Sequence, residues 1–292
     1  GEDTGGSSTG SAYVFERNVD GSWNEVNKIQ ASDKAAGDYF GKSVSISGNY
    51  AIVGAYLEDT GGSYAGAGYV FERNVDGSWN EVHKIQASDK TGSDMFGISV
   101  SISGTYAIVG AIGDDSGKGA GYVFERDIDG SWNEVNKIQA SDKQGDDNFG
   151  NSVSINGNYA IVGAPGEDTG GSEAGSAYVF QRNEDGTWSQ REKIQSSDKQ
   201  AQDYFGRSVS ISGTYAIVGA NGDDAGGGAA YTFERNVDDS WSQTQKIQAS
   251  DKEGGDQFGQ SVSISGSYAI VGAYGEDTGG SSTGSAYVFE RN

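Results

Sequence analysis

Short segments with apolar residues at a period of two, or in brief continuous runs, recur along the whole chain and predict β-strands. Phe40–Ser47 contains Ser-Val-Ser-Ile, in which small polar and β-branched residues alternate as in a half-buried strand. Tyr50–Ala55 is an almost continuous apolar run, which is typical of a strand covered on both faces. Gly68–Arg73 and Trp79–Gln86 follow, and the last is the most polar, as expected for an outer strand. The pattern therefore predicts a unit of four consecutive strands.

The segments between these strands predict how the strands are connected. Ser47-Gly48-Asn49 joins the first strand to the second, and Asn74–Ser78 joins the third to the fourth, both as short hairpins. Longer acidic loops, such as Glu58–Gly62, join the second strand to the third, and loops such as Ser88–Phe96 lead into the next unit. Because both kinds of long loop lie at the same end of an antiparallel sheet, we expect the acidic loops to gather on one face of the molecule.

Two landmarks show that the unit is repeated five times. A tryptophan in an Asp-Gly-Ser-Trp-like turn and a Phe-Gly pair both recur at spacings of 56, 53, 56 and 53 residues. The landmark residues are Trp23, Trp79, Trp132, Trp188 and Trp241, and Phe40, Phe96, Phe149, Phe205 and Phe258. Periods of about 40–50 residues or slightly more are typical of four-stranded propeller blades. We therefore expect an all-β fold, a β-propeller of four-stranded antiparallel blades, with five blades favoured and a piece of a larger propeller or array as the alternative.

The repeats predict one domain over residues 1–292, with units at about 39–94, 95–147, 148–203 and 204–256, and a last unit, 257–292, completed by 1–38. Gly1–Asn18 and Gly275–Asn292 are identical, so one third strand is surplus to a closed ring of five blades. Three interpretations stay open: a frayed duplicate end, a window of a longer array, or a strand that pairs with a neighbouring molecule and forms a head-to-tail polymer. In the third case the self-associating residues are Tyr13, Val14, Phe15, Tyr287, Val288 and Phe289.

The charge of the chain narrows the range of partners. There are 42 acidic residues against 20 basic ones, a net charge of −22, and no basic stripe that could neutralise the phosphates of a nucleic acid. Anionic membrane surfaces are disfavoured for the same reason, and no apolar run approaches the length of a membrane span, about 18 residues. Cysteine is absent, which excludes disulfides and thiolate metal sites. Such an acidic surface suits cations and solubility outside the cell.

These motifs resemble the FG-GAP repeat family, which includes the propeller of integrin α-subunits. One unit carries Phe149-Gly150 followed by Gly163-Ala164-Pro165, and the others carry Phe-Gly followed by Gly-Ala-Tyr, Gly-Ala-Ile or Gly-Ala-Asn. The resemblance implies a propeller used for extracellular recognition or adhesion, often linked to Ca²⁺. Two features depart from the family. Its propellers usually have seven blades, and the Asp-rich loop that holds calcium in integrins is Ser-Gly-Asn, Ser-Gly-Thr or Asn-Gly-Asn here.

Acidic pairs in the loops after the second strand are the candidate metal ligands. These residues are Glu58, Asp59, Asp114, Asp115, Glu167, Asp168, Asp223, Asp224, Glu276 and Asp277. Carboxylates on a flexible glycine-rich backbone suit Ca²⁺, which takes about six to eight oxygen ligands; the alternative is a solvated loop whose aspartate caps its own turn. In the loops after the fourth strand, we expect aspartates such as Asp33 and Asp38 to be structural and to accept backbone N–H bonds, with a metal or ligand role as the alternative.

The sequence contains no asymmetric cluster of the kind that catalysis requires. His83 is the single histidine and stands on the polar fourth strand, where we expect a surface residue. No nucleophile elbow, zinc-protease motif or phosphate-binding loop is present, so we expect no enzyme. The five tryptophans either form a sugar-binding ring or, as favoured, pack at the blade periphery against their own sheets.

Together these features predict a non-catalytic structural or adhesion module that is extracellular or on the cell surface. Its partner is either a second copy, in a head-to-tail filament, or an extracellular protein or glycan. The alternative is a multivalent, lectin-like propeller that binds glycans or other ligands, with or without Ca²⁺. We expect neither nucleic-acid binding nor membrane insertion.

Overall fold

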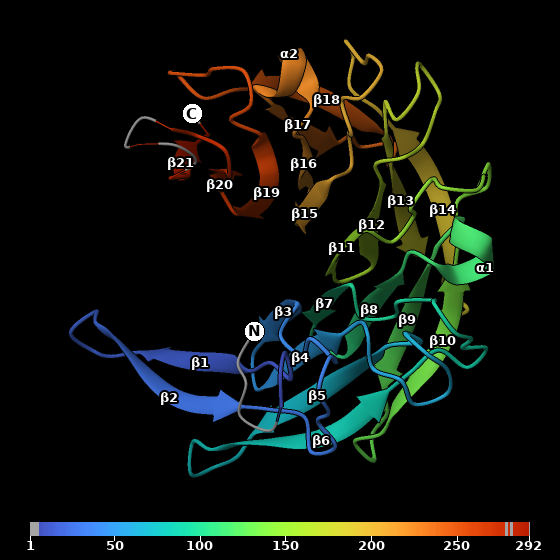
Figure 1. Ribbon diagram of the computed structural model, residues 1–292, viewed down its shortest axis with the longest axis vertical. Coiled ribbons are helices and arrows are strands. Elements are labelled where there is room, and N and C mark those ends of the chain that lie inside the picture. Colours follow the sequence, from blue (N-terminus) through green and yellow to red (C-terminus); the bar gives the residue numbers. More distant parts are fainter. Residues whose placement is uncertain (1–5, 278–279, 281–282, 292) are drawn as a thin grey trace.

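The computed structural model describes residues 6–277, 280 and 283–291 and shows a propeller in which blades stand around a common axis (Figure 1). Residues 43–247 form four complete blades, each a four-stranded antiparallel sheet with its strands in chain order. The strands are β3 (Ser43–Ser47), β4 (Tyr50–Ala55), β5 (Ala67–Arg73) and β6 (Trp79–Ile85); β7 (Ser99–Ser103), β8 (Tyr106–Ala111), β9 (Ala120–Arg126) and β10 (Trp132–Ile138); β11 (Ser152–Asn156), β12 (Tyr159–Ala164), β13 (Ser176–Arg182) and β14 (Trp188–Ile194); β15 (Ser208–Ser212), β16 (Tyr215–Ala220), β17 (Ala229–Arg235) and β18 (Trp241–Ile247).

The strands outside the four complete blades form two partial sheets, one from each end of the chain. A three-stranded sheet contains β19 (Phe258–Ser265), β20 (Tyr268–Ala273) and β21 (Ser285–Glu290), and a two-stranded sheet contains β1 (Ala12–Arg17) and β2 (Trp23–Ile29). These sheets lie at opposite ends of the curved row of blades (Figure 1), and within the described residues no backbone pairing joins them. The predicted all-β, five-bladed propeller is confirmed, and the duplicated third strand is present at both ends, as β1 and as β21.

The predicted strands agree with the observed ones to within a few residues. The first strand begins at Ser43 rather than Phe40, because Phe40 leaves the sheet and forms a parallel bridge with Gly10. The sequence pattern did not predict α1 (Asp114–Gly117) and α2 (Asp223–Gly226), which lie in the two short acidic loops. In α1 the left-handed residues Asp115 (φ 50°) and Ser116 (φ 62°) interrupt the coil, so it is a tight turn rather than a continuous helix.

Each blade packs on the next through two different faces. The face toward the following blade, which we name the trailing face, carries Ile52, Val70 and Ile85 in the first complete blade. The face toward the preceding blade, the leading face, carries Val100 and Ile102 on the first strand of the next blade, together with its Tyr, Phe and Trp side chains. The same two faces meet in the next two interfaces between complete blades. The core is therefore a series of sandwiched layers between sheets.

The Phe-Gly and Gly-Ala pairs lie where neighbouring blades approach most closely. Phe96 is fully buried against Tyr122, with ring centroids 5.5 Å apart. Gly97 has φ +92°, and a Cβ at this position would lie 2.4 Å from the carbonyl oxygen of Ala67. A Cβ on Gly54 would lie 2.0 Å from the carbonyl oxygen of Gly97. Both residues are glycine because the backbone of the adjoining blade leaves no room for a side chain.

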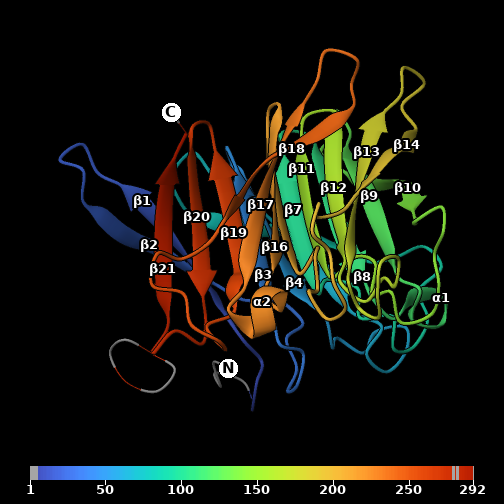
Figure 2. The ribbon, with the colours of Figure 1, turned by 90° about the horizontal axis from the view of Figure 1, so that it is seen from above.

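The hairpins and the long loops lie at opposite ends of the blades, as predicted (Figure 2). The hairpins between third and fourth strands project at one end, while α1, α2 and the longer loops lie at the other. Gly77, in the hairpin between the third and fourth strands of the first complete blade, has a positive φ of +89°. No helix among the residues described is long and apolar enough to cross a membrane.

Candidate functional site

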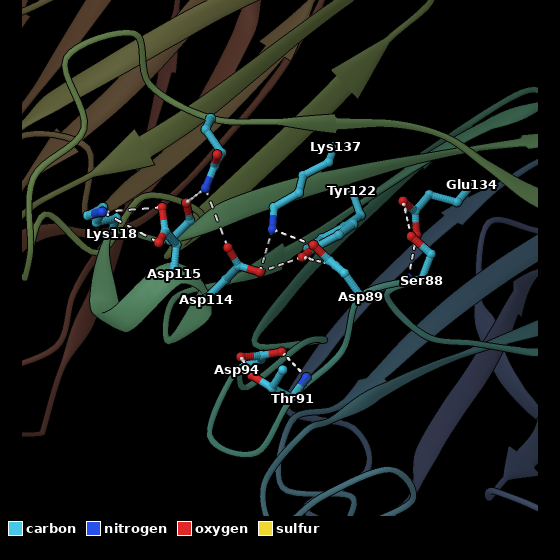
Figure 3. A network of polar contacts seen from close by, with 12 residues as sticks. Ser88, Asp89, Thr91, Asp94, Asp114, Asp115, Lys118, Tyr122, Glu134 and Lys137 are labelled. Atoms are coloured by element: carbon cyan, nitrogen blue, oxygen red, sulfur yellow. Dashed lines mark hydrogen bonds and ion pairs between the residues drawn. The ribbon is translucent and has the colours of Figure 1, made fainter.

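On the loop face, a lysine of the fourth strand joins two acidic loops in each complete blade. In the second complete blade, Nζ of Lys137 donates to Oδ2 of Asp89 at 2.7 Å and to Oδ2 of Asp114 at 2.8 Å (Figure 3). The hydroxyl oxygen of Tyr122 lies 2.8 Å from Oδ1 of Asp89 and 2.5 Å from Oδ2 of Asp114, so the two carboxylates share its single proton. Asp89 belongs to the loop that enters this blade, so the network ties the blade to its connection with the preceding one.

The contacts of lysine with both acids and of tyrosine with the aspartate of the entering loop recur in all four complete blades, with lysine Nζ to carboxylate distances between 2.6 and 2.9 Å. The tyrosine also contacts the buried acid in the two blades where that acid is aspartate, as Tyr231 does with Asp223 at 2.6 Å. The members of the network are Lys84, Lys137, Lys193 and Lys246; Asp33, Asp89, Asp142 and Asp198; Tyr69, Tyr122, Tyr178 and Tyr231; and the buried acids Glu58, Asp114, Glu167 and Asp223. In the fifth repeat, Tyr287 still donates to Asp251 at 2.8 Å, but its sheet lacks a fourth strand to supply a lysine.

Burial and hydrogen bonding set the charge of the tyrosine, the lysine and the aspartate of the entering loop. The buried acids are between 2% and 5% exposed. Burial, with the hydrogen bond to carboxylate, raises the pKa of the four network tyrosines far above its usual value. Burial opposes ionisation of Asp33, Asp89, Asp142 and Asp198, but hydrogen bonds from lysine and tyrosine outweigh it and lower their pKa. Burial likewise opposes the charged lysines, yet their hydrogen bonds to two carboxylates raise the pKa. The network is thus a neutral tyrosine with an ionised aspartate and lysine.

This arrangement separates the predicted calcium ligands, because the first acid of each pair is buried and the second is exposed. The first is the buried acid of the network, and Glu276, the first acid of the fifth pair, accepts a hydrogen bond from the Ser285 hydroxyl at 2.6 Å. The second members, Asp59, Asp115, Asp168, Asp224 and Asp277, are exposed.

Each of the four second members in the complete blades has a local contact of its own. Asp59 and Asp168 accept the backbone N–H of Tyr64 and Glu173, both at 2.8 Å. The exposed acids of α1 and α2 instead pair with lysines: Oδ2 of Asp115 lies 3.0 Å from Nζ of Lys143, and Oδ2 of Asp224 lies 2.6 Å from Nζ of Lys252. The hydrogen bond from Lys252 lowers the pKa of Asp224 to about 2.

In the part of the chain that the structure describes, no group of three or more His, Asp or Glu side chains could hold a metal ion. Calcium stays a prediction, and the lysines already neutralise the carboxylates that it would need.

The second aspartate of each loop that enters a blade is structural, as the sequence predicted. Asp94 is 3% exposed and accepts the backbone N–H of Thr91 at 2.5 Å. The equivalent bonds, also from the residue three positions earlier, measure 2.6 to 2.7 Å and are made by Asp38, Asp147, Asp203 and Asp256. Burial raises the pKa of Asp38, Asp147 and Asp203 despite this N–H donor.

Four of the tryptophans pack between blades, and both predictions for them are wrong. Trp132 is 5% exposed and meets Tyr50 of the preceding blade edge to face, with ring centroids 6.0 Å apart. Trp188 meets Tyr106 in the same way at 6.0 Å. Buried rings cannot form a sugar-binding ring, and their partners are on the neighbouring sheet rather than their own. Trp23, at the end of the row of blades, is instead 64% exposed. His83 is half-buried on β6.

The residues predicted for self-association divide into exposed and covered ones. Tyr13, Phe15 and Val288 are 45%, 52% and 69% exposed. Val14 is buried against the first complete blade, and Tyr287 and Phe289 pack half-buried on β19 and β20. The corresponding third-strand residues of complete blades, such as Tyr69 and Phe71, are buried at 0% and 2%. Each copy of the duplicated strand therefore has one face covered within the chain and one face open.

The Tyr–Asp–Lys network was not predicted from the sequence, although a signal for it exists. Asp, Tyr and Lys recur in the same order in each repeat, as in Asp33, Tyr69 and Lys84. The three are far apart along the chain and belong to a loop and two strands, so only the packing of the blade shows that they meet.

Comparison with known proteins agrees with this architecture. The FG-GAP repeat family matches residues 23–71, 79–124, 132–180, 188–233 and 241–289. A solved protein from Lactobacillus plantarum is similar in fold, with a TM-score of 0.54 and 15% sequence identity; the similarity covers 82% of this chain and 65% of that protein. No curated protein matches the chain. The five matches span most of the sequence, and each runs from a fourth strand through the first three strands of the next sheet. The chain therefore belongs to the FG-GAP repeat family.

Proposed function

We propose that this chain is a non-catalytic structural or adhesion module of the extracellular space that binds its partners by strand addition at the two open ends of its row of blades. One observation carries the proposal: both ends expose apolar side chains whose equivalents are buried between blades elsewhere in the molecule. Val44 and Ile46, on the leading face of the first complete blade, are 61% and 57% exposed, whereas Val100 and Ile102 are 7% and 4% exposed.

The opposite end shows the complementary face. Ile270 and Val288, on the trailing face of the last sheet, are 44% and 69% exposed, whereas Ile52 and Val70 are both 0% exposed. Contiguous exposed apolar side chains beside unpaired strand edges are typical of surfaces that bind other strands. Head-to-tail association of copies is the simplest form of such binding.

The loop face supports a role without catalysis. Its buried carboxylates, lysines and tyrosines contact one another in four equivalent networks, which leaves them no open coordination or reaction geometry. An extracellular place is supported by the acidic surface, with a net charge of −22, and by what the family resemblance implies. Proteolysis of intact cells that make the protein tests this location.

Sedimentation velocity over a wide concentration range tests the binding role of the ends. We expect the chain to self-associate with increasing concentration and Val44→Asp with Ile270→Asp to abolish the association. The matched control is Val19→Asp with Val75→Asp, which places the same charges on exposed hairpin tips and should change nothing. A chain that stays monomeric at every concentration would refute self-association through the ends.

A further inference from the structure

The two ends of the row of blades lack different strands. At the N-terminal end, β1 and β2 are a third and a fourth strand without the first and second strands of their sheet. At the C-terminal end, β19, β20 and β21 are a first, second and third strand without a fourth. In chain order a fourth strand is followed by a first and a second one, so the three missing strands form one continuous segment.

The N-terminal end has a groove where the missing second strand belongs. The groove has a volume of about 480 Å³ and is lined by β1 together with Val44 and Ile46 of β3 and Ala51 of β4. In the next interface, the equivalent leading face is covered by Ile52 of a second strand, which is completely buried. The groove therefore fits an isoleucine of a second strand.

The C-terminal end has a groove where the missing fourth strand belongs. Its volume is about 370 Å³, and Tyr215, Ile247 and Arg291 are among its lining residues. In complete blades the tryptophan that begins the fourth strand packs on the tyrosine equivalent to Tyr215, as Trp241 does on Tyr159 at 6.4 Å. The guanidinium of Arg291 already lies over the Tyr215 ring at 3.9 Å, as Arg235 lies over Tyr159 at 4.4 Å. This groove therefore fits a tryptophan.

Polar groups at both ends match the same missing segment. Between complete blades, serine hydroxyls on the first strand of one blade accept hydrogen bonds from backbone N–H groups of the next blade. The Ser45 hydroxyl accepts from the N–H of Ile102 at 3.1 Å, and the Ser47 hydroxyl accepts from the N–H of Gly104 at 3.1 Å. Ser263 and Ser265 stand at these positions on β19, where no further first strand follows among the residues described. A lysine on the added fourth strand would complete the contact between Tyr287 and Asp251.

We propose that the two ends together bind one continuous segment that carries the fourth, first and second strands of one further FG-GAP repeat, which closes the ring as six blades. The inference rests on the proposed function, and it names the partner of the two ends. The chain itself contains a segment of this kind, Val19–Tyr56, which directly follows Asn18. Because Gly275–Asn292 has the same sequence as Gly1–Asn18, a copy of Val19–Tyr56 placed after Asn292 would be joined by the same residues as in the native repeat. The five interfaces between successive sheets hold the two ends apart (Figure 1), so their own side chains do not cover each other.

The test uses the full chain extended after Asn292 by a second copy of Val19–Tyr56. Hydrogen exchange of β1 and β21 amides in the extended chain should slow by at least about 100-fold relative to the original chain, because the added second strand pairs with β1 and the added fourth strand pairs with β21. Sedimentation should show a monomer, since the extension covers the faces that associate. The matched control is the same extension with its copies of Trp23, Ile46 and Ile52 replaced by serine, which should leave exchange unchanged.

The outcomes separate this inference from the proposed function. If the original chain associates and the extended chain associates equally, with unchanged exchange, the inference is wrong and the proposed function stands. If β1 and β21 are already protected in the original monomer and the added segment exchanges freely, the two partial sheets pair with each other and both proposals are wrong. If the extension protects both edges and the serine control does not, the inference is supported whether or not the original chain associates.

Discussion

Replacing Lys137 by methionine removes the only cation shown between Asp89 and Asp114 while keeping the length of the side chain. The Asp114 side chain is 5% exposed, so its carboxylate would remain buried without its countercharge. Removing one partner of a buried ion pair costs about 3–5 kcal/mol. The Lys137 side chain is 28% exposed and that of Asp89 is 49% exposed, so solvent screens part of the interaction. We therefore expect the free energy of unfolding to fall by about 2–3 kcal/mol.

The loss is measured by urea unfolding followed through tryptophan fluorescence, and by the melting temperature, which should fall by about 4–10 °C. Lys118→Met is the matched control in the same loop region. Its ion pair with Asp115 is longer, at 3.4 Å, and both side chains are more than a third exposed, so the expected loss is below about 0.5 kcal/mol. Adding Asp114→Asn to Lys137→Met should restore about half of the loss, because the buried group is then neutral.

Equal stability of Lys137→Met and Lys118→Met would refute the reasoning, since it would mean that the network contributes no more than a surface ion pair. A Lys137→Met protein that is destabilised but not rescued by Asp114→Asn would also contradict it, because the cost would then come from lost packing rather than from the buried charge.

Three further predictions concern packing, pH and calcium. Trp132→Ala should lower the free energy of unfolding by about 3–5 kcal/mol and Trp23→Ala by less than about 1 kcal/mol, because only the first ring is buried between blades; equal losses in thermal melts would contradict this. Stability should fall as pH rises above about 10, by up to about 1.4 kcal/mol per pH unit for each network tyrosine, since a raised pKa in the folded state means that the proton is lost first from the unfolded chain. The raised lysine pKa values also lower stability as pH rises above about 10.5. Urea unfolding between pH 8 and 11.5 checks both effects, and a stability that does not change with pH would contradict a contribution of the network charges to folding. EGTA should leave the melting temperature unchanged, because lysines already neutralise the buried acids, and a clear decrease would instead support the calcium prediction.

The end faces show how strongly the environment of a residue depends on its neighbours. Ile46 and Ile102 occupy the same position of the same motif, yet one is 57% exposed and the other 4%. Trp23 and Trp132 differ in the same way. The motif determines the strand and the direction of the side chain, whereas the presence of a preceding blade determines burial.

The sequence alone determined the strands, their order, the repeat and the face on which the long loops lie. These features are local: a period of two defines a strand such as β3, and glycine with positive φ, such as Gly77, defines a hairpin. The structural role of Asp94 was also predictable, because its N–H donor is three residues away.

Only the tertiary structure decided what the acidic loops and the tryptophans do. Lys137 meets Asp89, forty-eight positions earlier, because the packing of a blade on its entering loop brings them together. Trp132 meets Tyr50 because two sheets stack in one particular order. The openness of both ends is likewise a property of how the sheets are assembled. Contacts between blades depend on which faces meet in space, and a repeat that is nearly identical in every unit carries no information on where the row of blades ends.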